Sequence, residues 1–296
     1  MGNSAFLRRF SFDKSALSMM PPRAPRSNKG DFGRVLCVCG SKGMSGAAYL
    51  AAKAAYRTGA GLVEIFTHEV NLAPLQAALP EAIVSVYSDL YGIDTLLPSI
   101  ERADAIVVGC GLGVTPLSRR ILSDLLHAIE GKNIPLVIDA DAINLLSRNP
   151  SLLKYVRGAI ITPHFMEASR LLKAPIEELL AQTEQTAFEI SRRCGAICVM
   201  KDHESAVSDA SDRIYINKSG NSGMATGGSG DVLSGIIGAI LAQNSKAKVK
   251  LSSLDVAALG VYIHGLAGDA AALRFGEYSL MASDIIESIP TVLNTK

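Results

Sequence analysis

The sequence predicts an α/β fold in which a mostly parallel central sheet is covered by helices on both faces. Short, continuous apolar runs alternate with segments of helical periodicity along most of the chain. Glycine-rich turns follow several of these runs, as expected where a buried strand leads into a helix. No repeat or linker divides the chain, so we expect one domain over residues 29–296, preceded by an irregular leader over residues 1–28.

The elements are predicted from apolar runs for strands and from a spacing of three and four residues for helices. The predicted strands cover residues 34–39, 62–66, 83–87, 105–108, 135–138, 159–161 and 196–200, and a hairpin joins residues 206–208 to residues 213–216. The predicted helices cover residues 48–58, 72–79, 95–102, 116–130, 176–193, 232–243, 252–274 and 282–289.

Composition limits the classes of function. With 296 residues, 48% of them hydrophobic, the chain can bury a sizeable core. A net charge of +1, the absence of a dense basic run and an aromatic content of 5% without Trp argue against nucleic acid or a membrane as partner. The five cysteines form no C-x-x-C pair, and the N-terminus has no secretory apolar region, so we expect reduced cysteines and a cytoplasmic protein.

A glycine-rich stretch from Asn217 to Asp231 is the candidate ligand loop. Its five glycines allow tight turns and a close approach of the backbone to a ligand. Apolar residues at helical spacing follow it, so Gly228, Ser229 and Gly230 are expected at a helix start, where free N–H groups attract phosphate.

Asp231 ends this stretch and has two interpretations. A carboxylate in the first turn of a helix is often a cap. Beside an anion hole, it could instead take a proton from a substrate hydroxyl while the amides hold the phosphoryl group that the hydroxyl attacks. The glycines on both sides favour the base.

Further candidates lie at the ends of predicted strands. Asp139 and Asp141 could bind Mg²⁺, directly or through water, or form a solvated turn and a helix cap. His164 and Glu167 lie three residues apart at a helix start and could face one pocket. Lys201 could be a point charge for phosphate, or simply solvated.

Seven blocks of sequence share their order with a known family. They lie at residues 40–47, 57–63, 109–113, 139–142, 162–164, 220–231 and 264–269. In this they resemble the NAD(P)H-hydrate dehydratases of the ribokinase-like superfamily, whose carbohydrate-kinase-type domain repairs hydrated nicotinamide cofactors. The resemblance implies a three-layer α/β/α sandwich. It also implies that ADP, or ATP in some members, phosphorylates the C6 hydroxyl of the S-form of the hydrate (NADHX or NADPHX), and that phosphate loss restores NADH or NADPH, giving AMP and phosphate.

The resemblance also implies roles for individual residues. Asp231 would be the base, and the amides of Gly228, Ser229 and Gly230 the anion hole. The hydrated cofactor would contact Asp231 together with Ala47, Gly113 and His164. The adenine nucleotide would contact Lys201, Asp202, His203, Glu204, Ser205, Asn221 and Gly230. Glu167 would hold Mg²⁺ through water.

Family members often form tetramers, so the resemblance implies a homo-oligomer. Many members carry a fused epimerase domain. The 28 residues before the predicted domain are too few for one, so we expect any NAD(P)H-hydrate epimerase partner to be a separate protein.

Two positions depart from the family pattern. Asp202 replaces the glycine that usually follows the lysine, which places a negative side chain near the expected nucleotide phosphates, and Cys110 replaces a common proline. One alternative function is a small-molecule kinase of the same superfamily, of the hydroxyethylthiazole or hydroxymethylpyrimidine type, because the fold does not decide the substrate. A second is a nucleotide-binding regulator without turnover, which would not need a base at Asp231.

Overall fold

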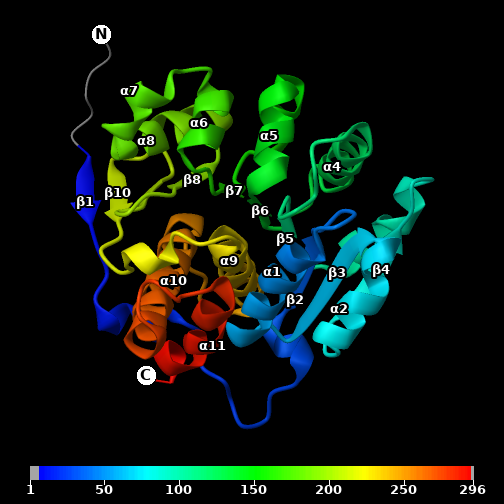
Figure 1. Ribbon diagram of the computed structural model, residues 1–296, viewed down its shortest axis with the longest axis horizontal. Helices are drawn as coiled ribbons and strands as arrows, with labels where there is room; N and C mark the ends of the chain where they lie inside the picture. The colour runs from blue at the N-terminus through cyan, green and yellow to red at the C-terminus, as the bar shows by residue number, and fades with distance from the viewer. Residues whose placement is uncertain (1–6, 295–296) are drawn as a thin grey trace.

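The structure, a computed structural model, describes residues 7–294 as one ten-stranded sheet between two layers of helices (Figure 1). The strands are β1 (Arg8–Phe10), β2 (Arg34–Val38), β3 (Leu62–His68), β4 (Ile83–Tyr87), β5 (Ala105–Val108), β6 (Leu136–Ile138), β7 (Ile160–Ile161), β8 (Ile197–Met200), β9 (Ala206–Ser208) and β10 (Arg213–Ile216). Their order in the sheet is β1-β10-β9-β8-β7-β6-β5-β2-β3-β4. Only β9 runs antiparallel to its neighbours among the described strands. The expected three-layer sandwich with a mostly parallel sheet is confirmed.

The helices divide between the two faces of the sheet. They are α1 (Ser45–Arg57), α2 (Leu72–Ala78), α3 (Leu97–Arg102), α4 (Pro116–Ala128), α5 (Ala140–Arg148), α6 (Phe165–Leu172), α7 (Ile176–Leu180), α8 (Thr183–Cys194), α9 (Ser229–Lys246), α10 (Ser253–Phe275) and α11 (Ala282–Leu293). Successive β2 residues alternate between two buried clusters: Val35 and Cys37 belong to the one with α1, α2, α9, α10 and α11, and Leu36 and Val38 to the one with α3–α8. This alternation is what a strand covered on both faces requires.

The helix α10 is long and apolar enough to cross a membrane by length and composition. However, 72% of its most apolar window is buried inside the protein, and it packs between α9 and α11. Its apolar surface therefore belongs to the core described here.

The carboxyl ends of the central parallel strands meet at one edge of the sheet. Backbone hydrogen bonds join them in turn: Gly40 N–H donates to Cys110 O at 2.8 Å, and Asp139 N–H to Val108 O at 3.1 Å. Lys201 N–H likewise donates to Pro163 O at 2.9 Å. This edge is where open α/β sheets bind ligands, and it brings together most of the candidate residues.

The expectation of an irregular leader is wrong in part, because two of its segments are regular. Residues 8–10 form β1, which pairs in parallel with β10, and residues 14–19 form a 3-10 helix. No apolar run in the sequence predicts this strand. Instead, the ring of Phe10 packs on that of Tyr215, with centroids 5.4 Å apart. Residues 1–6 of the leader lie outside the described residues.

The helix expected over residues 176–193 is also divided, into α7 and α8. At the break, Gln182 has φ −141° and ψ 49°, which no helix accommodates. The Thr183 hydroxyl donates to the Asp202 carboxylate at 2.8 Å and so ties the start of α8 to the loop after β8.

Candidate active site

The N-terminus of α9 forms the floor of the candidate site. Gly228 caps the helix with φ +90°, a conformation that favours glycine, and no side chain accepts from the first N–H groups. A methyl group added at Gly228 would lie 2.4 Å from Leu50 Cδ1. The predicted helix start is therefore present, with Asp231 as the third helical residue. The Ser229 N–H donates to Thr226 O at 3.3 Å, so the first-turn amides left for a ligand begin at Gly230.

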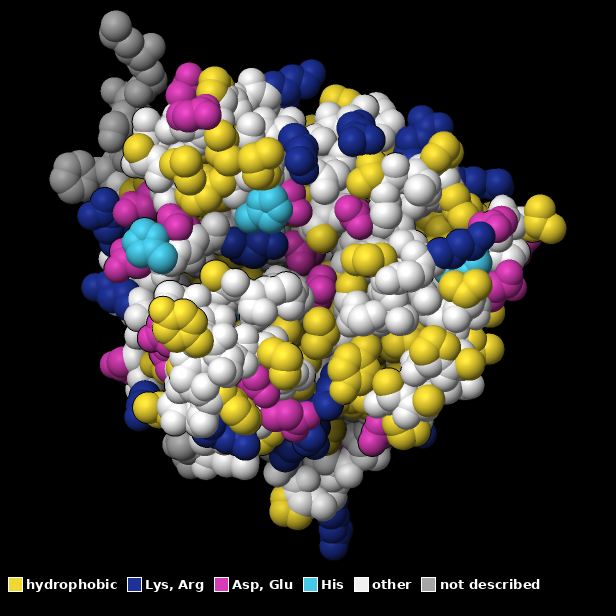
Figure 2. Space-filling model, in the orientation of Figure 1, with side chains coloured by type: hydrophobic (Ala, Val, Ile, Leu, Met, Phe, Trp, Pro, Cys, Tyr) yellow, Lys and Arg dark blue, Asp and Glu magenta, His cyan; other side chains and the backbone are white. Residues whose placement is uncertain are grey.

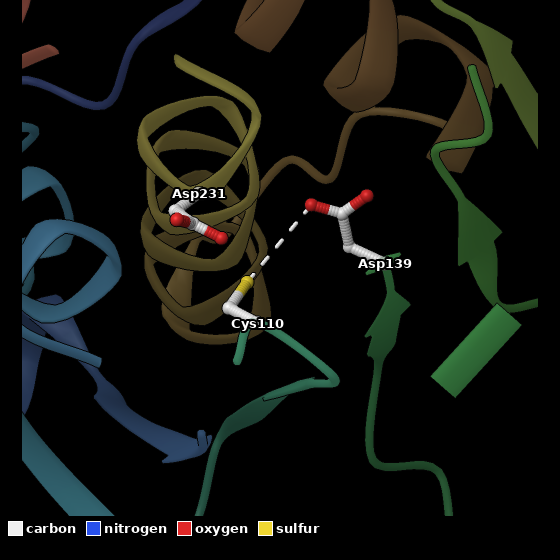
Figure 3. A group of neighbouring side chains, drawn as sticks. All are labelled: Cys110, Asp139 and Asp231. Carbon is white, nitrogen blue, oxygen red and sulfur yellow. Dashed lines mark hydrogen bonds between the residues drawn. The ribbon is translucent and has the colours of Figure 1, made fainter. Parts of the chain in front are cut away.

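Asp231 is half-buried in the first turn of α9, beside two groups from neighbouring strand ends (Figure 3). One carboxylate oxygen of Asp231, one of Asp139 and the Sγ of Cys110 all lie within 4.8 Å of one another. Burial, and then the negative charge of Asp139, raise the pKa of Asp231 to about 7. A carboxyl group with this pKa can accept and return a proton near neutral pH, as a general base must.

Asp139 lies at the carboxyl end of β6 and is only 1% exposed. Both of its carboxylate oxygens accept hydrogen bonds. Its Oδ1 accepts from Lys201 Nζ at 2.8 Å, and its Oδ2 accepts from Ser234 Oγ at 2.8 Å and from Cys110 Sγ at 3.9 Å. The next residue, Ala140, has φ +49°, which residues other than glycine seldom adopt.

Lys201 brings a positive charge to the start of α9. Burial opposes that charge, but Asp139 and Glu167 outweigh burial and raise the pKa of Lys201. A methyl group added at Gly230 would lie 3.3 Å from Lys201 Nζ, so the ammonium group lies against the first turn of α9. An ammonium group beside free helix amides makes a site for phosphate. Figure 2 shows basic, acidic and histidine side chains close together near the middle of this face.

His164 and Glu167 form a capping box at the start of α6. Glu167 Oε2 accepts from His164 N–H at 3.0 Å, and His164 Nδ1 accepts from Met166 N–H at 3.1 Å. Glu167 is 3% exposed, and burial raises its pKa. Half of the His164 side chain is exposed, and burial of the remainder, with the charge of Lys201, lowers its pKa.

The remaining candidates for the hydrated cofactor lie on the loops after β2 and β5. Ala47, in the first turn of α1, is 8% exposed, and a methyl group added at Gly111 would lie 2.8 Å from its Cβ. Gly113 N–H already donates to Asp141 Oδ2 at 2.7 Å. This part of the site is thus built from close backbone packing and small residues.

The stretch after Lys201 is held by hydrogen bonds within itself and to the start of α8. The Asp202 carboxylate accepts from the Thr183 hydroxyl and from His203 N–H, the latter at 2.7 Å. The negative charge at the position of the family's usual glycine is thereby held by neighbours other than Lys201. Asp202, His203 and Glu204 also line a pocket of about 690 Å³ together with β1. The hydroxyl of Ser205 donates to the carbonyl oxygen of Asp202, which closes the turn.

Asn221 stabilises the glycine-rich loop. Its Nδ2 donates to Asp269 Oδ1 at 3.0 Å, its Oδ1 accepts from Gly223 N–H at 3.1 Å, and Gly220 N–H donates to Asp269 Oδ2 at 2.9 Å. The loop is therefore tied to α10 beside the start of α9.

Sequence reasoning missed two residues of this site. Ser234 lies one helical turn after Gly230, a spacing that places both on the same face of α9. His264 on α10 lies within one of the matching blocks, and its Nε2 is 3.3 Å from Ser229 Oγ. Burial lowers the pKa of His264 to about 4, so its imidazole is neutral beside the start of α9.

The three-layer fold, with the candidate site at the carboxyl edge of its mostly parallel sheet, is that of the ribokinase-like class of proteins. A sequence profile described as NAD(P)H-hydrate dehydratase matches residues 35–291. The chain belongs to the NAD(P)H-hydrate dehydratase family.

Individual relatives agree with this assignment. The chain is 39% identical to the ADP-dependent (S)-NAD(P)H-hydrate dehydratase of Neisseria meningitidis over 83% of the chain and 80% of that protein. It is 38% identical to the bifunctional NAD(P)H-hydrate repair enzyme Nnr of Escherichia coli over 99% of the chain, but spans only 53% of that protein. The chain thus spans about half the length of several curated relatives that it matches.

Solved structures support the same fold. A ribokinase-like superfamily protein of Enterococcus faecalis superposes with a TM-score of 0.86 at 32% identity, covering 100% of this chain and 99% of that one. The ADP/ATP-dependent NAD(P)H-hydrate dehydratase of Bacillus subtilis, co-crystallised with ATP and Mg²⁺, superposes with a TM-score of 0.78 at 24% identity, over 96% and 97% of the two chains. The second likeness shows the fold alone.

Proposed function

We propose that this protein restores NADH and NADPH from the S-form of their hydrates, with ADP, or ATP in its place, as phosphoryl donor. The observation that carries the proposal is the position of Asp231. Its carboxyl group, with a pKa of about 7, lies in the first turn of α9 beside the amides of Ser229 and Gly230 and near the ammonium group of Lys201. The name of the relative from Neisseria meningitidis supports the reaction and the donor.

In the proposed reaction, Asp231 accepts the proton of the C6 hydroxyl while that oxygen forms a bond to the β-phosphorus of ADP. The bond from this phosphorus to the bridging oxygen breaks, and AMP leaves. The α9 amides and Lys201 stabilise the charge on the transferred phosphoryl oxygens. The C6–O bond then breaks with loss of phosphate, and release of a proton from C5 restores the C5=C6 double bond.

Mg²⁺ is part of the proposal and would neutralise nucleotide phosphate charge. The neighbouring carboxylates offer the oxygen chemistry that this ion prefers. Glu167 already accepts from the His164 N–H, and its Oε2 is 3.9 Å from Lys201 Nζ. Contact through water is therefore the form in which Glu167 would hold the ion.

The other contacts follow the same scheme. Ala47, Gly113 and His164 would face the hydrated cofactor, and residues 201–205 with Asn221 the nucleotide. A cytoplasmic homo-oligomer, with an NAD(P)H-hydrate epimerase as its functional partner, completes the proposal. Exposed apolar side chains near the turn between α10 and α11, at Leu273, Tyr278 and Met281, support a contact with a second copy.

The test is a spectrophotometric assay of the regained nicotinamide absorbance. The protein is mixed with hydrated NADH or hydrated NADPH, and with ADP or ATP. We expect the absorbance to return only with nucleotide present. Nucleotide consumption that yields a stable phosphorylated product without regained absorbance would favour a kinase instead, and absence of turnover with every pair would contradict the proposal.

A further inference from the structure

We propose that Asp139 is a positioning residue for the nucleotide. It holds the ammonium group of Lys201 at the N-terminus of α9, where the transferred phosphoryl group is expected, and keeps it there before the nucleotide arrives. The inference rests on the proposed function only for the identity of that ligand. It concerns an acidic residue that touches neither ligand in the proposed reaction.

Asp139 is the closest anionic partner of Lys201. The Lys201 Nζ is 2.8 Å from Asp139 Oδ1 but 3.9 Å from Glu167 Oε2. The side chain of Asp139 is 1% exposed, whereas that of Lys201 is 20% exposed. A buried carboxylate requires a partner far more than a lysine that reaches solvent does. The buried partner therefore decides where the mobile side chain rests.

The other oxygen of Asp139 fixes this pair to α9. Ser234, fully buried in α9, donates its hydroxyl hydrogen to Asp139 Oδ2 at 2.8 Å. Because Gly230 and Ser234 lie one turn apart, the bond ties Asp139 to the face of α9 on which Gly230 lies. Methyl groups added at Gly230 would lie 3.3 Å from Lys201 Nζ and 3.7 Å from Asp139 Oδ2. The end of β6, the end of β8 and the start of α9 are thereby joined around one carboxylate.

The consequence is a lysine with its conformation already selected. A free lysine side chain loses rotamer freedom when it is immobilised, and this loss opposes binding. Here Asp139 already holds the Lys201 side chain in the folded protein, so nucleotide binding does not have to immobilise it. Without the charge of Asp139, Lys201 would have Glu167 as the nearest remaining carboxylate, on the α6 side of the site.

The sign of the effect separates this role from simple electrostatics. Asp139 is negative and close to the expected phosphate, so removing its charge should tighten nucleotide binding if charge alone mattered. If Asp139 acts by positioning Lys201, removing its charge should weaken binding. Asp141 is the matched control, because it lies two residues away and its Oδ2 accepts from Gly113 N–H rather than from Lys201.

The experiment is a double-mutant cycle on ADP binding to the full chain, measured by isothermal titration calorimetry. We expect Asp139→Asn to raise the dissociation constant of ADP by about tenfold or more, because a buried charge pair is broken. Lys201→Ala should raise it at least as much. The double variant should match Lys201→Ala within about twofold, because Asp139 has nothing left to position. Asp141→Asn should leave the constant within about twofold of wild type or lower it.

An unchanged or tighter ADP affinity in Asp139→Asn would overturn the proposal, as would effects that multiply in the double variant. If Asp139→Asn does not fold, Ser234→Ala takes its place, since it keeps the charge pair but frees it from α9. We expect ADP binding to weaken by about threefold there, and an unchanged affinity would overturn the proposal. Calorimetry needs no hydrated cofactor, so failure of the proposed reaction in the absorbance assay is a separate result.

Discussion

The two sides of the candidate site are formed by different types of residue. On the side of β6, β8 and α9, charged side chains face one another: Asp139 pairs with Lys201, and Asp231 lies beside them. On the side of the loops after β2 and β5, small residues pack closely, with a methyl group at Gly111 coming 2.8 Å from Ala47 Cβ. The first side should therefore respond to changes of charge and pH, and the second to changes of volume.

The largest expected effect is on the charged side. Asp231→Asn keeps the volume but removes the base, so we expect turnover to fall by about 10²- to 10⁴-fold in the absorbance assay. ADP affinity should stay the same or tighten, because a negative charge is lost. Turnover near the wild-type rate would remove Asp231 from the role of base.

The stability of this variant is its control. The raised pKa means that the folded protein holds the Asp231 proton more tightly than the unfolded chain does. The stability gained in this way is complete below about pH 4 and is lost as pH rises through about 7. At pH 8, Asp231→Asn should therefore melt at or above the temperature of wild type, which excludes misfolding as the cause of lost turnover.

The next largest effect is that of pH on the wild-type protein. The proposed base must be ionised to accept a proton, and the pKa of Asp231 is about 7, so activity should be highest above neutrality. Below pH 7, kcat/KM should fall by about tenfold per unit. A profile that is flat between pH 5.5 and 8 would show that the charge on Asp231 does not limit the reaction.

A volume change tests the other side. In Gly111→Ala, the added methyl group meets Ala47 Cβ at 2.8 Å, and φ of +61° strains the backbone by about 1 kcal/mol. We expect the KM for the hydrated cofactor to rise by about fivefold to tenfold, because small displacements at a binding site are costly. The dissociation constant of ADP should not change.

A second substitution serves as the control for this contact. Ala47→Gly in the Gly111→Ala background removes the Ala47 methyl group that the added methyl group contacts, so part of the lost cofactor affinity should return. If the double variant is no better than Gly111→Ala, the contact between the two loops is not the cause.

The smallest effect is expected at Asp202. Its carboxylate accepts from Thr183 and His203, so it should repel the nucleotide little. Asp202→Gly, which restores the residue usual in the family, should change ADP affinity by less than about twofold. An increase of tenfold would show that the negative charge does face the phosphates.

The sequence predicted the features that depend on neighbouring residues. Five glycines before an apolar helical stretch were enough to place the start of α9, and the apolar runs placed the central strands. Pairings between distant residues could not be predicted. Asp139 is separated from Lys201 by 62 residues and from Ser234 by 95, and either aspartate of the Asp-Ala-Asp stretch fits the pattern equally well. Only the arrangement of the strands decides which of the two meets the lysine.

The strand β1 escaped prediction for a related reason. Its stability comes from pairing with β10 and from contacts of Phe10, neither of which leaves a local pattern in a three-residue segment. The break between α7 and α8 is similar, since no glycine or proline marks it. The contact found there, from Thr183 to Asp202 in the loop after β8, joins residues distant in sequence.

The position of β1 also bears on how the protein avoids self-association. An exposed strand at the edge of a sheet offers unpaired amides and carbonyls to other chains. Here β10 is covered on that side by β1, a short strand that carries Arg8 and Arg9. The strand β10 is synthesised some two hundred residues after β1. Its edge stays unpaired until the N-terminal segment folds back and β1 pairs with it. A shortened protein that starts after Phe12 should therefore retain its catalytic groups yet precipitate more readily.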